Sequence, residues 1–195
     1  MNYLNLNSFK KGNDFIKFQE GKFEIVFSTA ENNKSFNRNT EEGINELEAL
    51  IDEFHGENVE YLKQIHSNKV YTYRKGSNDF KDNEGDALIT NEKKVIIGVF
   101  TADCVPVILV DKENEAIAAI HSGWKGTFSS IVTETILRMK EEYNSKAENI
   151  VAYIGPHIRK CCYEVSEDLK EQFLKKFDIE KDKLFNGRNL SLEEC

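Results

Sequence analysis

Reactive side chains stand at the ends of apolar runs in this sequence of 195 residues. One run leads to His66, a second is interrupted at Cys104, and a third ends at His121. Strand ends and the loops beside them are where binding and catalytic residues gather. One thiolate and two imidazoles suit a zinc ion whose fourth position is left to water, the arrangement of catalytic rather than structural zinc sites.

The spacing of these three residues does not by itself establish a metal site, because it matches none of the short ligand pairings. A cysteine in an apolar strand is usually a small core residue, and a single histidine is more often structural than a ligand. The same residue types also fit a metal-free cysteine hydrolase or deamidase, with Cys104 as nucleophile and His121 as base. The residues alone leave these interpretations open, and metal content separates them.

The residues that follow His121 suit an anion. Gly123 and Gly126 free the backbone N–H groups, Lys125 adds a positive charge, and a helix is expected just after them. We therefore expect phosphate to bind here. A tight strand-to-helix turn with Lys125 in solvent explains the same residues.

Two aspartates are candidates to orient the ligands rather than to act directly. Asp103 immediately precedes Cys104 and would project to the opposite face if Cys104 lies in an extended strand. Asp86 stands between Gly85 and Ala87, where a turn explains it equally well. Carboxylates that hydrogen-bond metal ligands fix their orientation, which is the role expected here.

Strand-like runs rich in β-branched and aromatic residues fill the middle of the chain. Residues 95–110 are apolar at nearly every position, as expected of strands covered on both faces. The expected strands are Phe23–Phe27, Val59–Leu62, Lys69–Tyr73, Val95–Phe100, Val105–Val110, Ala116–Ile120 and Ile150–Ile154.

Three helices have readable signals. Thr40 can cap a helix whose apolar stripe runs from Ile44 to Phe54, and Ser166 can cap another. Between them, apolar residues recur at helical spacing from about Phe128 to Tyr143. Strands and helices do not alternate regularly, so we expect an α+β protein, a single domain of mixed β-sheets flanked by helices over residues 1–195.

Composition narrows the function classes. The net charge of -8 opposes binding to a phosphate backbone, so no nucleic-acid partner is expected. No stretch approaches the roughly 20 apolar residues of a membrane span, and the N-terminus has no secretory pattern. Four cysteines, two of them adjacent at Cys161 and Cys162, do not resemble a disulfide framework. We expect a soluble cytoplasmic protein with reduced thiols and no membrane partner.

Five motifs, in order, resemble the YfiH-like laccase-domain family, and the similarity covers about residues 21–170. They are Gln64–Val70 (QIHSNKV), Gly85-Asp86-Ala87, Thr101–Pro106 (TADCVP), His121–Thr127 (HSGWKGT) and Ile154–Val165 (IGPHIRKCCYEV). Members of that family carry metal-binding residues at the positions of His66, Cys104 and His121. The resemblance therefore implies a YfiH-like architecture and a metal site made of these three residues, with Zn²⁺ as cofactor or, alternatively, Cu²⁺.

The resemblance also implies an enzyme whose partners are a nucleoside and phosphate. The family's reactions are phosphorolysis of adenosine, inosine and methylthioadenosine, and deamination of adenosine. Zinc at the triad would lower the pKa of water to about 7 and supply hydroxide for attack on the purine C6. Phosphorolysis instead needs phosphate near the ribose C1′. The family's older label, copper-dependent polyphenol oxidase, fits less well, because several coppers need many imidazoles and this chain has four histidines.

The sequence departs from the family pattern in places. Members usually have alanine where Ser122 stands and arginine where Lys125 stands. A lysine does not offer the bidentate contact with phosphate that an arginine offers. The family pattern continues for several dozen residues, whereas this chain stops at Cys195, so its C-terminal region is expected to be missing or shortened. This departure supports a third interpretation, a non-catalytic binding module with a vestigial site. Cell-wall precursors are a further substrate class connected with the family.

Overall fold

The computed structural model describes residues 10–195 except 13, 30, 78 and 79, and the chain forms two compact units. The first unit comprises Met1–Val59 and Lys94–Ile96, and the second comprises Glu60–Lys93 and Ile97–Cys195. That the whole chain behaves as a single domain stays a prediction.

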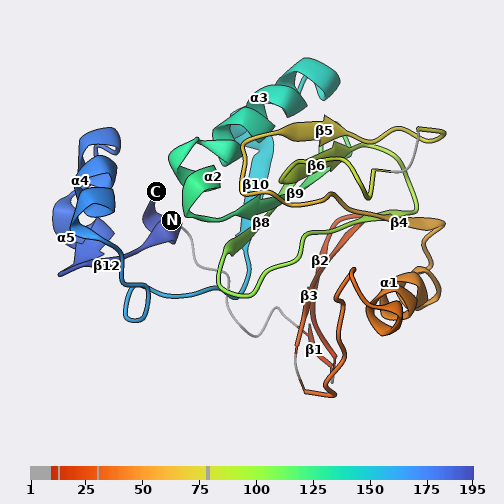
Figure 1. Cartoon of the computed structure of the whole chain (residues 1–195). Helices are drawn as coiled ribbons and strands as arrows, with labels where there is room; N and C mark the ends of the chain where they lie inside the picture. Colours follow the sequence, from red (N-terminus) through yellow and green to blue (C-terminus); the bar gives the residue numbers. More distant parts are fainter. Residues whose placement is uncertain (1–9, 13, 30, 78–79) are drawn as a thin grey trace. The chain divides into compact units, whose positions relative to one another are not determined.

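The first unit contains a three-stranded antiparallel sheet and a helix (Figure 1). Its strands are β1 (Lys10–Lys11), β2 (Phe15–Glu20) and β3 (Phe23–Ser28). Helix α1 (Glu41–Glu53) begins after Thr40, whose hydroxyl accepts a hydrogen bond from the backbone N–H of Gly43 at 3.2 Å, as the sequence predicts. The ring of Phe15 packs against those of Phe36 and Phe54. Strands β4 (Asn58–Glu60) and β7 (Val95–Ile97) form a separate two-stranded sheet.

Five strands form the central sheet of the second unit in the order β10-β8-β9-β6-β5 (Figure 1). They are β5 (Val70–Thr72), β6 (Ala87–Thr90), β8 (Val105–Asp111), β9 (Ala116–Ser122) and β10 (Ile150–Ile154). Neighbouring strands are antiparallel except for β5 and β6. Ile120 of β9 lies opposite Ala87 on one side and Val107 on the other. This register brings the starts of β6 and β8 and the end of β9 to one end of the sheet.

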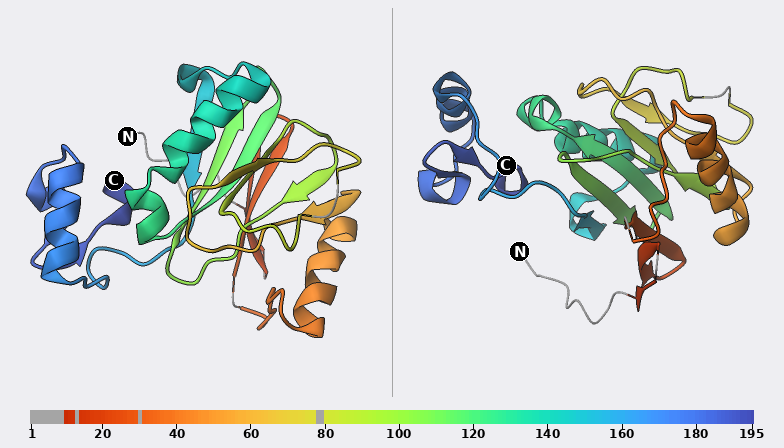
Figure 2. Two further views of the ribbon diagram at one scale, coloured as in Figure 1. Left: turned by 45° about the horizontal axis from the view of Figure 1, so that its top comes forward. Right: turned by 60° about the horizontal axis from the view of Figure 1, so that its bottom comes forward.

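Helices α2 (Trp124–Phe128) and α3 (Ile131–Tyr143) follow β9 and cover one face of this sheet (Figure 2). The sequence predicts one helix that starts near Phe128, and this predicted start is wrong. Ser130 has a φ of 61°, in the left-handed region, so the chain breaks there and the long helix begins at Ile131.

The C-terminal part of the second unit adds short elements. Helix α4 (Glu167–Lys176) begins after Ser166, whose side chain accepts from the N–H of Leu169, and this cap confirms the prediction. The others are the 3-10 helix η2 (Ala147–Asn149), α5 (Lys181–Leu184), β11 (Phe185–Asn186), β12 (Asn189–Leu190) and the 3-10 helix η3 (Leu192–Glu194).

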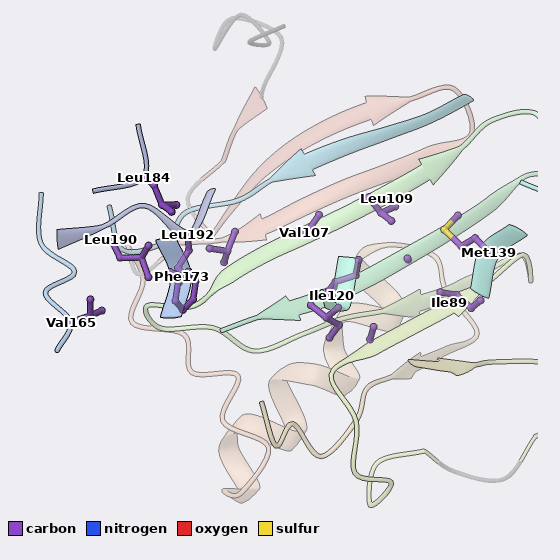
Figure 3. Close-up of a cluster of buried hydrophobic side chains, with 14 of the residues drawn as sticks. Ile89, Val107, Leu109, Ile120, Met139, Val165, Phe173, Leu184, Leu190 and Leu192 are labelled. Carbon is purple, nitrogen blue, oxygen red and sulfur yellow. The ribbon is translucent and has the colours of Figure 1, made fainter. Parts of the chain in front are cut away.

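One hydrophobic cluster joins these elements (Figure 3). Met139 of α3 packs with residues of the central strands such as Ile89, Leu109 and Ile120, and the cluster continues through Phe173 of α4. Full burial of such a side chain contributes about 1.5–3 kcal/mol. The core therefore holds in place the ends of β6, β8 and β9, where Asp86, Cys104 and His121 lie. The mixture of sheets and separate helices confirms the predicted fold class, and no described helix could span a membrane.

Candidate metal centre

The side chains of His66, Cys104 and His121 come together at one end of the central sheet, although they are far apart in the sequence. Sγ of Cys104 lies 3.8 Å from Nε2 of His66, and the two imidazole rings meet edge to face with centroids 4.8 Å apart. The three ligand atoms all lie within 4.8 Å of one another. Within the described part of the chain, no other group of three or more His, Cys, Asp or Glu side chains could hold a metal ion.

Each of the three residues comes from a different part of the second unit. His121 is the second-last residue of β9 and is buried. Cys104 is partly buried in a bend directly before β8, so the extended strand considered for Asp103 and Cys104 is not formed. His66 is exposed in the loop before β5. The cluster is therefore closed on the side of His121 and open to solvent on the side of His66.

Asp86 connects both histidines. It directly precedes β6, and it is fully buried. Its Oδ1 accepts from Nδ1 of His121 at 2.9 Å and from the backbone N–H of His66 at 2.9 Å. Its Oδ2 accepts from the backbone N–H of Ile65 at 3.3 Å, and from the N–H and hydroxyl of Ser67 at 2.6 and 2.7 Å. One carboxylate thus fixes a buried ring and the backbone of an exposed loop.

These hydrogen bonds determine how the two rings are presented. His66 has a φ of 61°, a left-handed conformation that costs a non-glycine residue roughly 1–3 kcal/mol unless its surroundings impose it. The carboxylate of Asp86 imposes it by binding three consecutive N–H groups. Because Nδ1 of His121 is engaged with Asp86, its Nε2 is the atom left for the cluster, as in carboxylate–histidine–metal arrangements.

The charges in the cluster are strongly coupled. Burial disfavours ionised Asp86, but hydrogen bonds from His121 and Ser67 outweigh it and lower the pKa of the carboxyl to about 2. Burial likewise disfavours protonated His121, but Asp86 and Cys104 raise the pKa of that imidazole to about 9. The pKa of His66 is lowered, first by burial and then by the neighbouring His121. A metal ion would have to displace a proton from His121 at neutral pH.

Residues 18–192 match the model of a family described as multi-copper polyphenol oxidoreductase laccase. The chain belongs to this family. The sequence resemblance to YfiH-like laccase domains is thereby confirmed.

Relatives of this laccase-family chain carry a different name. It is 46% identical over 181 residues to a purine nucleoside phosphorylase of Clostridium acetobutylicum, a match that covers 93% of this chain and 75% of that protein. It is 50% identical over 95 residues to a purine nucleoside phosphorylase of Bacteroides thetaiotaomicron, covering 48% of this chain and 35% of the relative. The crystal structure of the Bacillus licheniformis hypothetical protein YfiH shares its fold with a TM-score of 0.83 at 21% identity, over 96% of this chain and 81% of that one.

In this laccase domain, the turn after β9 packs directly against the candidate ligands. A Cβ atom on Gly123 would lie 2.7 Å from Cδ2 of His66 and 2.9 Å from Sγ of Cys104. A Cβ atom on Gly126 would lie 3.2 Å from the backbone oxygen of Ser67. Close packing therefore explains both glycines, and their contact with phosphate stays a prediction.

Lys125 and Asp103 are both exposed. The Nζ atom of Lys125 lies 5.5 Å from the ring centroid of Trp124, and its positive charge is one cause of the lowered pKa of His66. The backbone oxygen of Asp103 accepts from the N–H of Ile158 at 2.9 Å. Among the described residues, the carboxylate of Asp103 makes no hydrogen bond to the three candidate ligands, so the structure does not bring it into the cluster as it does Asp86.

Two further residues of the laccase motif around His66 were not singled out from the sequence. Ser67 binds Asp86 through both its N–H and its hydroxyl. The side chain of Gln64 binds the backbone of Phe100. Their position on either side of His66, within the first matched motif, was the only signal in the sequence.

Proposed function

We propose that this chain is a metal-dependent purine nucleoside enzyme, which cleaves adenosine, inosine and methylthioadenosine with phosphate and deaminates adenosine. The observation that carries the proposal is the convergence of His66, Cys104 and His121 with Asp86 behind them. Additional support comes from the Clostridium acetobutylicum relative, which is named a purine nucleoside phosphorylase.

The donor set fits zinc. Zinc–sulfur bonds of about 2.3 Å and zinc–nitrogen bonds of about 2.0–2.1 Å at tetrahedral angles place sulfur and nitrogen ligands roughly 3.5 Å apart. Cys104 Sγ and His66 Nε2 lie 3.8 Å apart, so a small side-chain movement suffices. A thiolate with two imidazoles also binds copper, but three ligands and an open position favour zinc. We expect a single ion, because the described residues supply one such group.

A metal-free cysteine hydrolase is the competing function, and the geometry gives it a specific basis. Asp86 bonded to His121, with His121 beside Cys104, resembles an acid–base–nucleophile triad. Such a triad has no use for a second imidazole. The position of His66, held by Asp86 in a left-handed conformation beside the sulfur, favours the metal centre.

Each residue has a defined task in the proposed reactions. A bound zinc ion would supply Lewis acidity and lower the pKa of water to about 7. Asp86 would keep the ring of His121 in the tautomer that presents Nε2. Lys125, exposed and near enough to lower the pKa of His66, would hold phosphate beside the site for cleavage of the glycosidic bond. Ile65, an exposed apolar residue next to His66, would offer a surface to the purine.

The proposal is tested with folded, metal-analysed protein and a panel of inosine, adenosine, methylthioadenosine and a phenol. We expect release of the free base in the presence of phosphate. We expect conversion of adenosine to inosine in the absence of phosphate as well. His66→Ala and His121→Ala should each abolish both reactions while the melting temperature changes little. If neither reaction occurs in metal-loaded protein, the function is wrong. If the variants lose stability and activity in proportion, these histidines are structural.

A further inference from the structure

We infer that Gln64 is a positioning residue, which holds the loop of His66 and the segment of Cys104 at the separation that metal binding requires. The inference rests on the proposed metal centre. It concerns a residue outside the candidate ligand cluster, whose side chain binds the backbone of Phe100.

The side-chain amide of Gln64 binds both polar groups of one distant peptide segment. Its Nε2 donates to the carbonyl oxygen of Phe100 at 2.8 Å, and its Oε1 accepts from the N–H of Phe100 at 2.7 Å. An amide is the side-chain group that donates and accepts side by side, so it pairs with a backbone as a neighbouring strand does. Gln64 stands two residues before His66, and Phe100 stands four before Cys104.

The amide of Gln64 connects two segments that lie outside helices and strands. Strand β7 ends at Ile97 and β8 begins at Val105, and residues 98–104 lie outside any strand. Around Gln64 the chain forms only an isolated bridge, at Lys63. The ring of Phe100 also packs edge to face on Tyr61 with centroids 5.1 Å apart, so the same two segments meet twice.

This contact complements the role of Asp86. Asp86 joins the loop of His66 to His121, but among the described residues it makes no hydrogen bond to the segment of Cys104. Gln64 supplies the connection between the loop of His66 and the segment of Cys104. Because sulfur and nitrogen ligands of zinc lie roughly 3.5 Å apart, a shift of one loop by an ångström or more would separate Cys104 from His66.

The test uses Gln64→Met, which keeps the length of the side chain and removes both hydrogen bonds, and Gln64→Glu, which keeps only the acceptor. Thr90→Val is the matched control. The hydroxyl of Thr90 likewise donates to one backbone carbonyl, that of Tyr73 at 3.2 Å, and accepts from one N–H, that of Glu92 at 3.0 Å. It is buried at the end of β6 remote from Asp86.

Zinc affinity is measured by competition with a chromophoric chelator, and coordination geometry by the visible absorption of Co²⁺ at saturation. Gln64→Met should bind Zn²⁺ about 10-fold to 100-fold more weakly and change the Co²⁺ spectrum. Gln64→Glu should fall between it and the parent. Thr90→Val should retain the Zn²⁺ affinity and the Co²⁺ spectrum of the parent, even if its melting temperature falls as far as that of Gln64→Met.

The outcomes separate this inference from the proposed function. If the parent binds Zn²⁺ and both Gln64 variants match it in affinity and spectrum, Gln64 is merely structural and the inference is overturned, while the metal centre stands. An equal loss in Thr90→Val would also overturn it. If the parent binds neither ion, the proposed metal centre fails, and the inference fails with it.

Discussion

Replacing Asp86 by asparagine removes a charge and one acceptor oxygen with almost no change of shape. The carboxylate receives five hydrogen bonds, two on Oδ1 and three on Oδ2. An amide has one acceptor oxygen, so at most three of these bonds survive, and its NH₂ group then faces donors. A hydrogen bond to a charged group contributes about 1.5–3 kcal/mol, so the loss of two predicts a destabilisation of about 3–6 kcal/mol.

The same network sets how this loss depends on pH. The pKa of Asp86 lies at about 2, below its unfolded value, so its stabilisation is complete above about pH 4 and is lost as the pH falls toward 2. The pKa of His121 is raised to about 9, so its contribution is complete below about pH 6.5 and is lost as the pH rises through 9. The difference between parent and Asp86→Asn should therefore be largest between about pH 4 and 6.5.

Urea unfolding of metal-free protein, followed by the fluorescence of Trp124, measures this effect in the second unit. The control is Asp103→Asn, which removes an exposed carboxylate next to Cys104 and should change stability by no more than about 0.5 kcal/mol. A loss of stability in Asp86→Asn below about 1 kcal/mol, or one that is the same at pH 5 and pH 9, would show that the Asp86 network does not stabilise the fold in this way.

Three further predictions concern the turn after β9 and the protons of the site. Gly123→Ala should weaken Zn²⁺ binding at least tenfold, because its Cβ would lie 2.7 Å from ring carbon Cδ2 of His66 and 2.9 Å from Sγ of Cys104. Gly98→Ala, where nothing lies within 4 Å, should leave the affinity unchanged, and equal affinities in a chelator competition would contradict this. Lys125→Ala should slow inosine phosphorolysis about tenfold to a hundredfold, from a lost contact of about 1.5–3 kcal/mol, and spare adenosine deamination. Initial rates across a phosphate titration check this, and equal losses in both reactions would show that the turn is only structural. Zn²⁺ affinity should rise with pH up to about 9 as the proton on His121 becomes easier to displace. Calorimetry at several pH values measures it, and a flat profile would contradict this prediction.

Much of the fold could be predicted because its strongest elements follow local rules. The apolar runs gave β8, β9 and β10, and the bounds of β10 agree with the prediction. The caps at Thr40 and Ser166 depend only on a side chain and an N–H group three residues ahead. Such signals survive because packing reinforces them.

The errors lie where local pattern and tertiary structure diverge. The apolar spacing from Phe128 onward gives no indication that Ser130 is left-handed. That backbone conformation separates α2 from α3. Strand β6 was missed because four buried residues form too short a run to stand out, and its place is set by pairing with β5 and β9. Strand β2, Phe15–Glu20, was also missed, although its alternation of apolar and polar residues was readable.

The site divides in the same way. The residue types made His66, Cys104 and His121 candidate metal ligands, but their spacing could not show that they form one site. The resemblance to a family grouped them. The five hydrogen bonds of Asp86 depend on strand register, which no single-sequence pattern reveals. The two-sided contact of Gln64 with Phe100 spans 36 positions and has no local signature.

Elemental analysis of the chain, purified without added metal, shows whether His66, Cys104 and His121 hold a metal ion. Close to one divalent ion per chain, zinc before copper, is expected, and this ion should be lost in Cys104→Ala. A metal content near zero that is the same in the parent and in Cys104→Ala would rule out the metal centre and would favour Cys104 as a nucleophile.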